Sequence, residues 1–62
     1  MKLDVNKVNA VMAEKLFSVK RLTEESGLAE PSVSKAIKGN NCTHITAGKI
    51  AKALGVKTIE IM

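Results

Sequence analysis

The stretch from Gly27 to Gly39 constrains the fold of this chain more than any other, because one proline lies between two glycines at the spacing of a short helix. Proline suits the first helical position, where its missing N–H has no intrahelical partner. Glycine supplies the left-handed residue that commonly ends a helix. The stretch therefore predicts a tight turn after Gly27 and a two-turn helix over about Pro31–Lys38.

This helix would present two different faces, because successive residues are about 100° apart. Val33, Ala36 and Ile37 share one face, which is suited to packing against a core. The opposite face is small, hydroxylic and cationic, and it consists of Pro31, Ser34, Lys35 and Lys38. A DNA major groove admits an α-helix and is bordered by phosphates. We therefore interpret this segment as a DNA-recognition helix.

The charge of the chain is unevenly distributed. The 62 residues carry a formal net charge of +4, and residues 31–59 contain five lysines and no acidic residue. Such a region favours a polyanionic partner, although a generally solvated basic surface would give the same count. A chain of this length forms one domain, here residues 1–62, with a modest hydrophobic core.

Two helices are predicted before the recognition helix. The first runs from Asp4 to about Glu14 with Asp4 as its N-cap, and its inward positions are Val5, Val8 and Met12, with Val11 as a further candidate. The second runs from Val19 to about Glu25 with Ser18 as its N-cap, and it buries Val19 and Leu22. Gly27 then ends it, and so few residues remain before Pro31 that the second and third helices must cross sharply.

A fourth helix is predicted from about His44 to Leu54, capped by Thr43 and ended by Gly55. Its inward residues are Ala47, Ile50, Ala51 and Leu54. Gly48 costs about 1 kcal/mol relative to alanine, so it either permits a close backbone approach or limits the stability of the helix. The tail Val56–Met62 favours a short fifth helix capped by Thr58, although Ile59 and Ile61 also alternate as in a strand. The sequence thus predicts a compact all-α fold of four or five helices.

Several other classes of protein are not expected. Cys42 is the only cysteine and His44 the only histidine, so we expect neither a disulfide framework nor a metal site. The chain lacks a carboxylate pair with a partnering histidine and a glycine-rich phosphate loop, and we expect no enzyme and no cofactor. No run approaches the roughly 20 apolar residues of a membrane span, and no signal-peptide core is present, so we expect a cytoplasmic protein without a membrane partner.

Two blocks carry a resemblance to a known family. The block Leu22-Thr-Glu-Glu-Ser-Gly-Leu-Ala-Glu-Pro-Ser-Val-Ser-Lys-Ala-Ile-Lys-Gly39 resembles the helix-turn-helix of phage Cro and lambda-type repressors, and is also similar to the lactose-repressor headpiece. The block Ile50-Ala-Lys-Ala-Leu-Gly-Val56 looks like the end of the fourth helix in the Cro/repressor (XRE) family. The resemblance implies a compact lambda-repressor-like bundle with a central helix-turn-helix. It also implies a bacterial or phage regulator that acts at the nucleoid and binds double-stranded operator DNA, usually as a two-fold homodimer.

The resemblance also implies which residues approach DNA. They lie at the start of the second helix, along the recognition helix and just after it, and they are Ser18, Lys20, Arg21, Glu30, Pro31, Ser32, Ser34, Lys35, Lys38 and Asn40. Glu30 and Pro31 stand where relatives often carry base-reading side chains, and neither side chain can donate a hydrogen bond at neutral pH. Direct readout should therefore depend on Ser32, Ser34 and Lys35.

Two further expectations concern packing and assembly. Met12 and Ile37 stand where relatives often join the first and third helices by a buried Arg–Glu pair, and we expect the two side chains to touch in the core. An apolar pair can replace a buried ion pair without loss of stability. The apolar tail Val56–Met62 is the candidate dimer surface, although it could instead serve only as part of the core.

The favoured interpretation is a sequence-specific transcriptional regulator. The alternative is a protein-interaction module, such as an antitoxin or the partner of an antirepressor. Salt distinguishes the two, because DNA affinity falls steeply as the salt concentration rises, whereas an apolar protein interface changes little. Binding of single-stranded nucleic acid is less favoured, because the chain has no tyrosine or tryptophan on which bases could stack.

Overall fold

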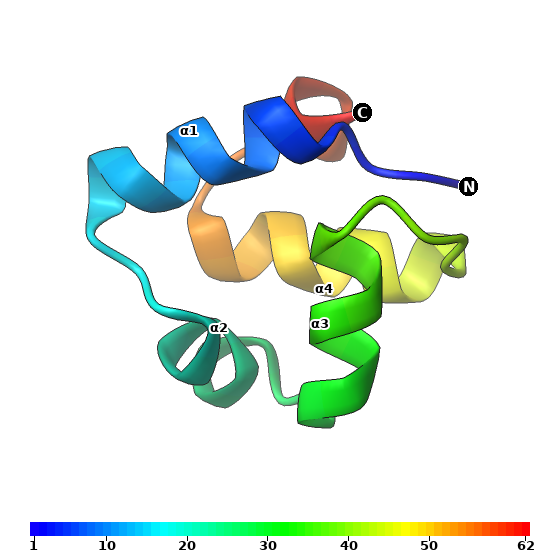
Figure 1. Ribbon diagram of the computed structural model, residues 1–62, viewed down its shortest axis with the longest axis horizontal. Coiled ribbons are helices and arrows are strands. Elements are labelled where there is room, and N and C mark those ends of the chain that lie inside the picture. Colours follow the sequence, from blue (N-terminus) through cyan, green and yellow to red (C-terminus); the bar gives the residue numbers. More distant parts are fainter.

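The computed structural model describes all residues, 1–62, as an all-helical chain. It contains four α-helices and a final 3-10 helix, so the predicted all-α fold of four or five helices is confirmed. The elements are α1 (Val5–Lys15), α2 (Val19–Ser26), α3 (Glu30–Ile37), α4 (His44–Leu54) and the 3-10 helix η1 (Thr58–Ile61) (Figure 1).

Three of the helices begin at the predicted capping residues. The side-chain oxygens of Asp4, Ser18 and Thr43 each accept a hydrogen bond from the backbone N–H three residues later, at 3.0, 3.1 and 3.2 Å respectively. Each bond satisfies one of the donors that the start of a helix leaves without a partner. These starting points could be predicted because each depends on a few consecutive residues.

The recognition helix α3 is displaced by one residue from the predicted range of Pro31–Lys38. It begins at Glu30 after Ala29, which has no side-chain cap, so Pro31 is its second residue. The position still suits proline, because the first-turn N–H groups have no intrahelical partner. Lys38 is the C-cap, and Gly39 follows with a φ of +88°.

Helix α1 ends at a left-handed residue that is not glycine. Leu16, directly after α1, has a φ of 55° and is 86% exposed. Its N–H donates to the Ala13 carbonyl at 3.2 Å, and the Phe17 N–H donates to the Met12 carbonyl at 2.9 Å. This pair of bonds is the Schellman ending, which usually has glycine in the left-handed position. This ending was not predicted, because leucine rarely adopts the left-handed conformation.

Eleven buried side chains form a single core. They are Leu3, Val8, Met12, Leu22, Val33, Ala36, Ala47, Ile50, Ala51, Leu54 and Ile61. Four predicted inward residues are not fully buried: Val5 is 37% exposed, and Val11, Val19 and Ile37 are half-buried at the edge of the core. Leu3 was not predicted, because it precedes the first helix and belongs to no periodic pattern.

The tail is helical, so the strand alternative is wrong. The N-cap of η1 is Lys57 rather than the predicted Thr58, and the Lys57 N–H donates to the Glu60 carboxylate at 2.7 Å. The single 3-10 turn directs Ile61 into the core and leaves Ile59 exposed at 70% and Met62 at 44%. Part of the tail is therefore core, and part of it remains apolar surface.

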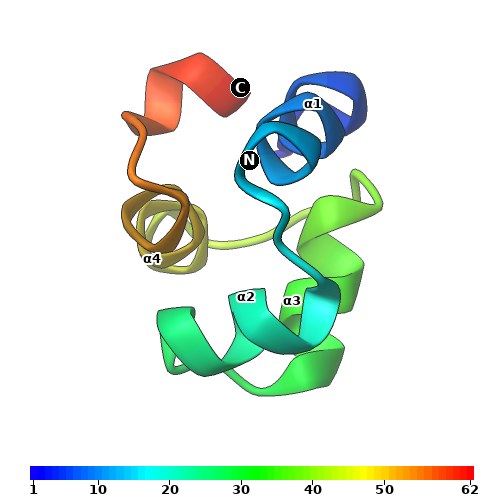
Figure 2. The same ribbon diagram turned by 90° about the vertical axis from the view of Figure 1, so that its left-hand side faces the viewer.

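The central element of the packing is α4. It contacts each of the other four elements and contributes four of the eleven buried residues. Figures 1 and 2 show α1 and η1 together at one end of the molecule and α2 and α3 at the other, with α4 between them. The inner side of α3 thus packs against α2 and α4, and its outer side faces solvent.

Candidate nucleic-acid interface

The short connection Gly27–Ala29 sets the angle between α2 and α3. Gly27 is left-handed, with a φ of 71°, and its N–H donates to the Thr23 carbonyl at 3.1 Å. The Leu28 N–H donates to Ser26 Oγ at 3.3 Å, which ties the turn to the last residue of α2. Because the turn is this tight, α3 crosses α2 sharply and packs against it (Figure 2).

The outer surface of α3 is formed by short and cationic side chains. Pro31, Ser32, Lys35 and Lys38 are all exposed, whereas Val33 and Ala36 are completely buried. Lys35 and Lys38 are three residues apart, so they are neighbours on the surface. Ser34 was predicted on this face, but it is half-buried. Ser32 lies the same angle from Val33 on the other side and is exposed, so helical periodicity alone does not decide this burial.

The two ends of α3 carry different polar groups. Glu30 is exposed in the first turn, where a carboxylate suits the positive end of the helix dipole. At the other end, the Gly39 N–H donates to the Ala36 carbonyl and the Asn40 N–H to the Lys35 carbonyl, both at 3.1 Å. These two bonds hold exposed Asn40 against the end of α3 and extend the polar surface beyond the helix.

The start of α2 carries the remaining predicted contacts. Ser18, Lys20 and Arg21 are all exposed, and Ser18 Oγ also caps the helix. The guanidinium carbon of Arg21 lies 4.5 Å from the centre of the Phe17 ring, a cation–π contact that the sequence analysis missed. The separation of four residues between the cation and the aromatic ring was the available signal. Lys20 lies about 100° around the helix from Arg21, so the two cations point in different directions.

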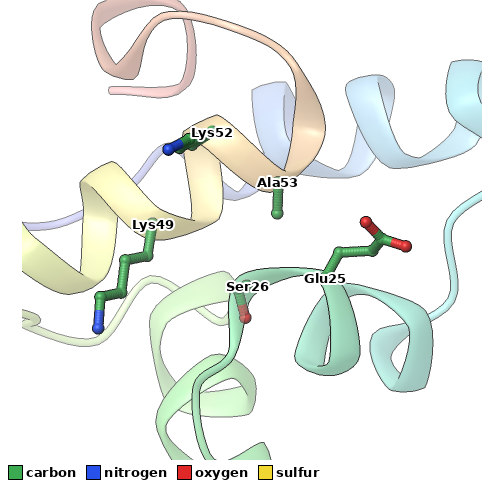
Figure 3. A pocket seen from close by; sticks show the side chains of 5 residues that line it. All are labelled: Glu25, Ser26, Lys49, Lys52 and Ala53. Carbon is green, nitrogen blue, oxygen red and sulfur yellow. The ribbon is translucent and has the colours of Figure 1, made fainter.

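A cleft also lies between the last turn of α2 and α4. It measures about 450 Å³ and is lined by Glu25, Ser26, Lys49, Lys52 and Ala53 (Figure 3). The ammonium groups of Lys49 and Lys52 point away from the Glu25 carboxylate across the opening. The lining contains one carboxylate, no histidine and no thiol, and Ala53 is its only apolar residue.

The remaining candidate groups stay apart. No three histidine, cysteine, aspartate or glutamate side chains gather as metal ligands; Cys42 is half-buried and His44 is exposed. None of the helices combines the length and the apolar character needed to cross a lipid bilayer.

The sharp α2–α3 crossing, with a cationic outer surface on the second helix of the pair, defines a helix-turn-helix DNA-binding domain. A sequence model of the Cro/C1-type HTH DNA-binding domain matches residues 7–62, which is nearly the whole chain. This chain belongs to that family, as its resemblance to Cro and lambda-type repressors predicted, and the family's ligand is double-stranded DNA. No curated protein and no solved structure matched the chain.

Proposed function

We propose that this protein is a sequence-specific transcriptional regulator that binds operator DNA with α3 in the major groove. The observation that carries this proposal is the outer surface of α3, which is exposed and is cationic toward the end of the helix, at Lys35 and Lys38. Pro31 and Ser32 keep the start of the surface small, and Lys35 and Lys38 provide its charge. The regulator would act where bacterial or phage DNA is transcribed, at the nucleoid in the cytoplasm.

The exposed polar residues divide into two roles under this proposal. Lys35 lies near the middle of the outer face, where an ammonium group can reach the O6 and N7 atoms of guanine. Lys38, Asn40 and the start of α2 lie at the edges, where side chains and N–H groups meet phosphates. Ser34 contributes less than the sequence indicated, because it is half-buried.

We further propose that two copies bind one operator. The domain is 25 Å in its longest dimension, which is shorter than the roughly 34 Å of one DNA turn that separates half-sites. Ile59 in η1 and Met62 directly after it provide exposed apolar surface. This surface supports a homodimer in which the two tails pack together, with one α3 in each half-site.

The test is selection of bound duplexes from a random pool, followed by gel shifts of the selected and scrambled duplexes at two salt concentrations. We expect one enriched sequence with inverted half-sites and an affinity that falls by orders of magnitude over a fourfold rise in salt. Binding that is insensitive to salt, or equal for both duplexes, would contradict the proposal. The protein-interaction alternative would then become the better explanation.

A further inference from the structure

Residues Met1–Leu3, here called the N-terminal strap, connect two distant parts of the fold. At one end, the Cys42 N–H donates to the Met1 carbonyl at 2.8 Å, and the Met1 amine donates to the Cys42 carbonyl at 3.0 Å. At the other end, the Asp4 N–H donates to the Ile61 carbonyl at 2.8 Å. Figure 1 shows this first segment beside the α3–α4 connection. The strap therefore spans from η1 to that connection.

The strap is also part of the core. Leu3 is only 4% exposed and belongs to the single buried cluster. Burial of this one leucine side chain supplies the main apolar contribution to docking. The backbone bonds at Met1 and Asp4 then fix the direction of the strap. The Leu3 side chain is consequently the part of the strap whose removal would release it.

The connection that the strap contacts follows the recognition helix directly. Residues 38–43 link α3 to α4 and include Lys38 and Asn40, two predicted DNA contacts. Gly39 and Asn40 are bonded back to α3, and Thr43 caps α4. The backbone N–H and carbonyl of Cys42 are both hydrogen-bonded to Met1 of the strap. The strap therefore supplies the hydrogen bonds that hold the middle of the connection to the rest of the fold.

The start of α1 restrains the same connection from the side. A β-carbon added at Gly39 would lie 2.9 Å from the Val5 side chain, so Gly39 sits directly against α1. Val5 and the strap thus hold consecutive parts of the connection. The strap precedes residues 7–62, which match the family.

We propose that the N-terminal strap is a positioning element for DNA binding, with Leu3 as its positioning residue. It holds the α3–α4 connection in the conformation that presents Lys38 and Asn40 beside the groove. This inference rests on the proposed function, because it assumes that α3 and its end face DNA. Undocking the strap lowers the fraction of molecules in the binding-competent conformation, and the apparent affinity falls in proportion to that fraction.

The single cysteine makes the proposal testable, because Cys42 lies at the strap contact. We would measure the rate at which a disulfide reagent labels the Cys42 thiol under native conditions, together with affinity for the selected duplex. The variants are Leu3→Ala, which removes the buried side chain, and Leu3→Met, which preserves its volume. Ala53→Gly, at the far end of α4, is the control for a general loss of stability. If Leu3→Ala does not fold, Leu3→Val takes its place.

We expect Leu3→Ala to raise the labelling rate, and to weaken duplex binding about tenfold if a tenth of the molecules stay competent. Leu3→Met should behave as the unchanged chain, and Ala53→Gly should alter neither quantity once unfolding measured in urea is taken into account. This inference alone would be overturned if Cys42 in Leu3→Ala were labelled at the rate of the unchanged chain. It would also be overturned if Leu3→Ala bound the duplex as tightly as Ala53→Gly does. An unchanged chain that binds no duplex would instead overturn the proposed function, and this inference with it.

Discussion

Leu16 holds a left-handed backbone conformation that costs an L-amino acid roughly 1–2 kcal/mol. Its side chain is 86% exposed, so burial does not offset this cost. Leu16→Gly should therefore raise the free energy of unfolding, by about 0.5–1 kcal/mol after the greater chain entropy of glycine is subtracted. Leu16→Ala is the matched control, because alanine retains the β-carbon that causes the strain. Urea unfolding that ranks the two variants equally would contradict this explanation.

Gly48 lies in the interior of α4, and its conformation does not require glycine. A β-carbon added there would have no other atom within 4 Å, so a close backbone approach does not explain this residue. Of the two explanations considered from the sequence, limited helix stability is the one that fits. Gly48→Ala should stabilise the fold by about 1 kcal/mol in urea unfolding.

Gly27→Ala provides a control with the same chemical change and the same free space. A β-carbon at Gly27 would also have no atom within 4 Å, but its φ of +71° is strained for alanine. This variant should lose about 1–2 kcal/mol of unfolding free energy. The two substitutions are therefore expected to change the free energy of unfolding in opposite directions. Changes in the same direction would show that backbone conformation does not decide their effect on stability.

Substitutions of Lys35 and of Lys38 should affect DNA binding in different ways. Lys35→Ala should cost about 1–3 kcal/mol on the preferred duplex and reduce discrimination against other sequences, because it removes a contact to a base. Lys38→Ala should weaken binding to all sequences alike and lower the salt slope by about one, because it removes a contact to a phosphate. Binding of both variants would be measured on selected and scrambled duplexes over a range of salt. Unaltered affinity for both variants, with an intact fold, would show that α3 is not the reading helix.

At the scale of elements, the expected contact between α1 and α3 concerns Met12 and Ile37. Met12 is 8% exposed and lies in the core, and half-buried Ile37 packs against that core. Because Ile37 is only half-buried, Ile37→Ala should cost less than the roughly 2–5 kcal/mol of a fully buried site. Direct contact remains a prediction that a double-mutant cycle can test.

The cycle compares Met12→Ala, Ile37→Ala and the double variant in urea unfolding. Side chains that touch should give a coupling free energy of about 0.5–3 kcal/mol, whereas independent sites add within about 0.5 kcal/mol. A second cycle, which pairs Met12→Ala with Ile45→Ala on the exposed side of α4, gives the baseline. Coupling no larger than this baseline would rule out the contact.

At the scale of the whole molecule, the proposed homodimer depends on apolar surface that the fold leaves exposed on η1. Ile59→Glu should prevent association of the tails and reduce affinity for an operator with two half-sites. It should leave the free energy of unfolding nearly unchanged, because Ile59 is 70% exposed. Sedimentation with and without the selected duplex measures the assembly. Leu16→Glu is the control. It adds the same charge at an exposed residue directly after α1, away from the tail, and it should not alter assembly. A monomer in both conditions for the unchanged chain would refute the dimer.

Residues only a few positions away set several of the helix boundaries. Asp4, Ser18 and Thr43 act through hydrogen bonds to residues three positions away, and Gly27 and Gly55 end their helices through similarly short bonds. Such bonds are complete within about six residues, so a local pattern contains the information that they need. The two faces of α3, and hence most of the candidate DNA surface, followed from the same local periodicity.

How those elements share the core depends on contacts between residues that are distant in the sequence. The most strongly patterned segment of the sequence is α3, but α4 is the helix that contacts every other element. Burial of Leu3, partial burial of Ser34 and exposure of Val5 all depend on neighbours that are distant in sequence. The strap contact at Cys42 joins residues 41 positions apart. No local pattern encodes such contacts, because each exists only after the helices have packed against one another.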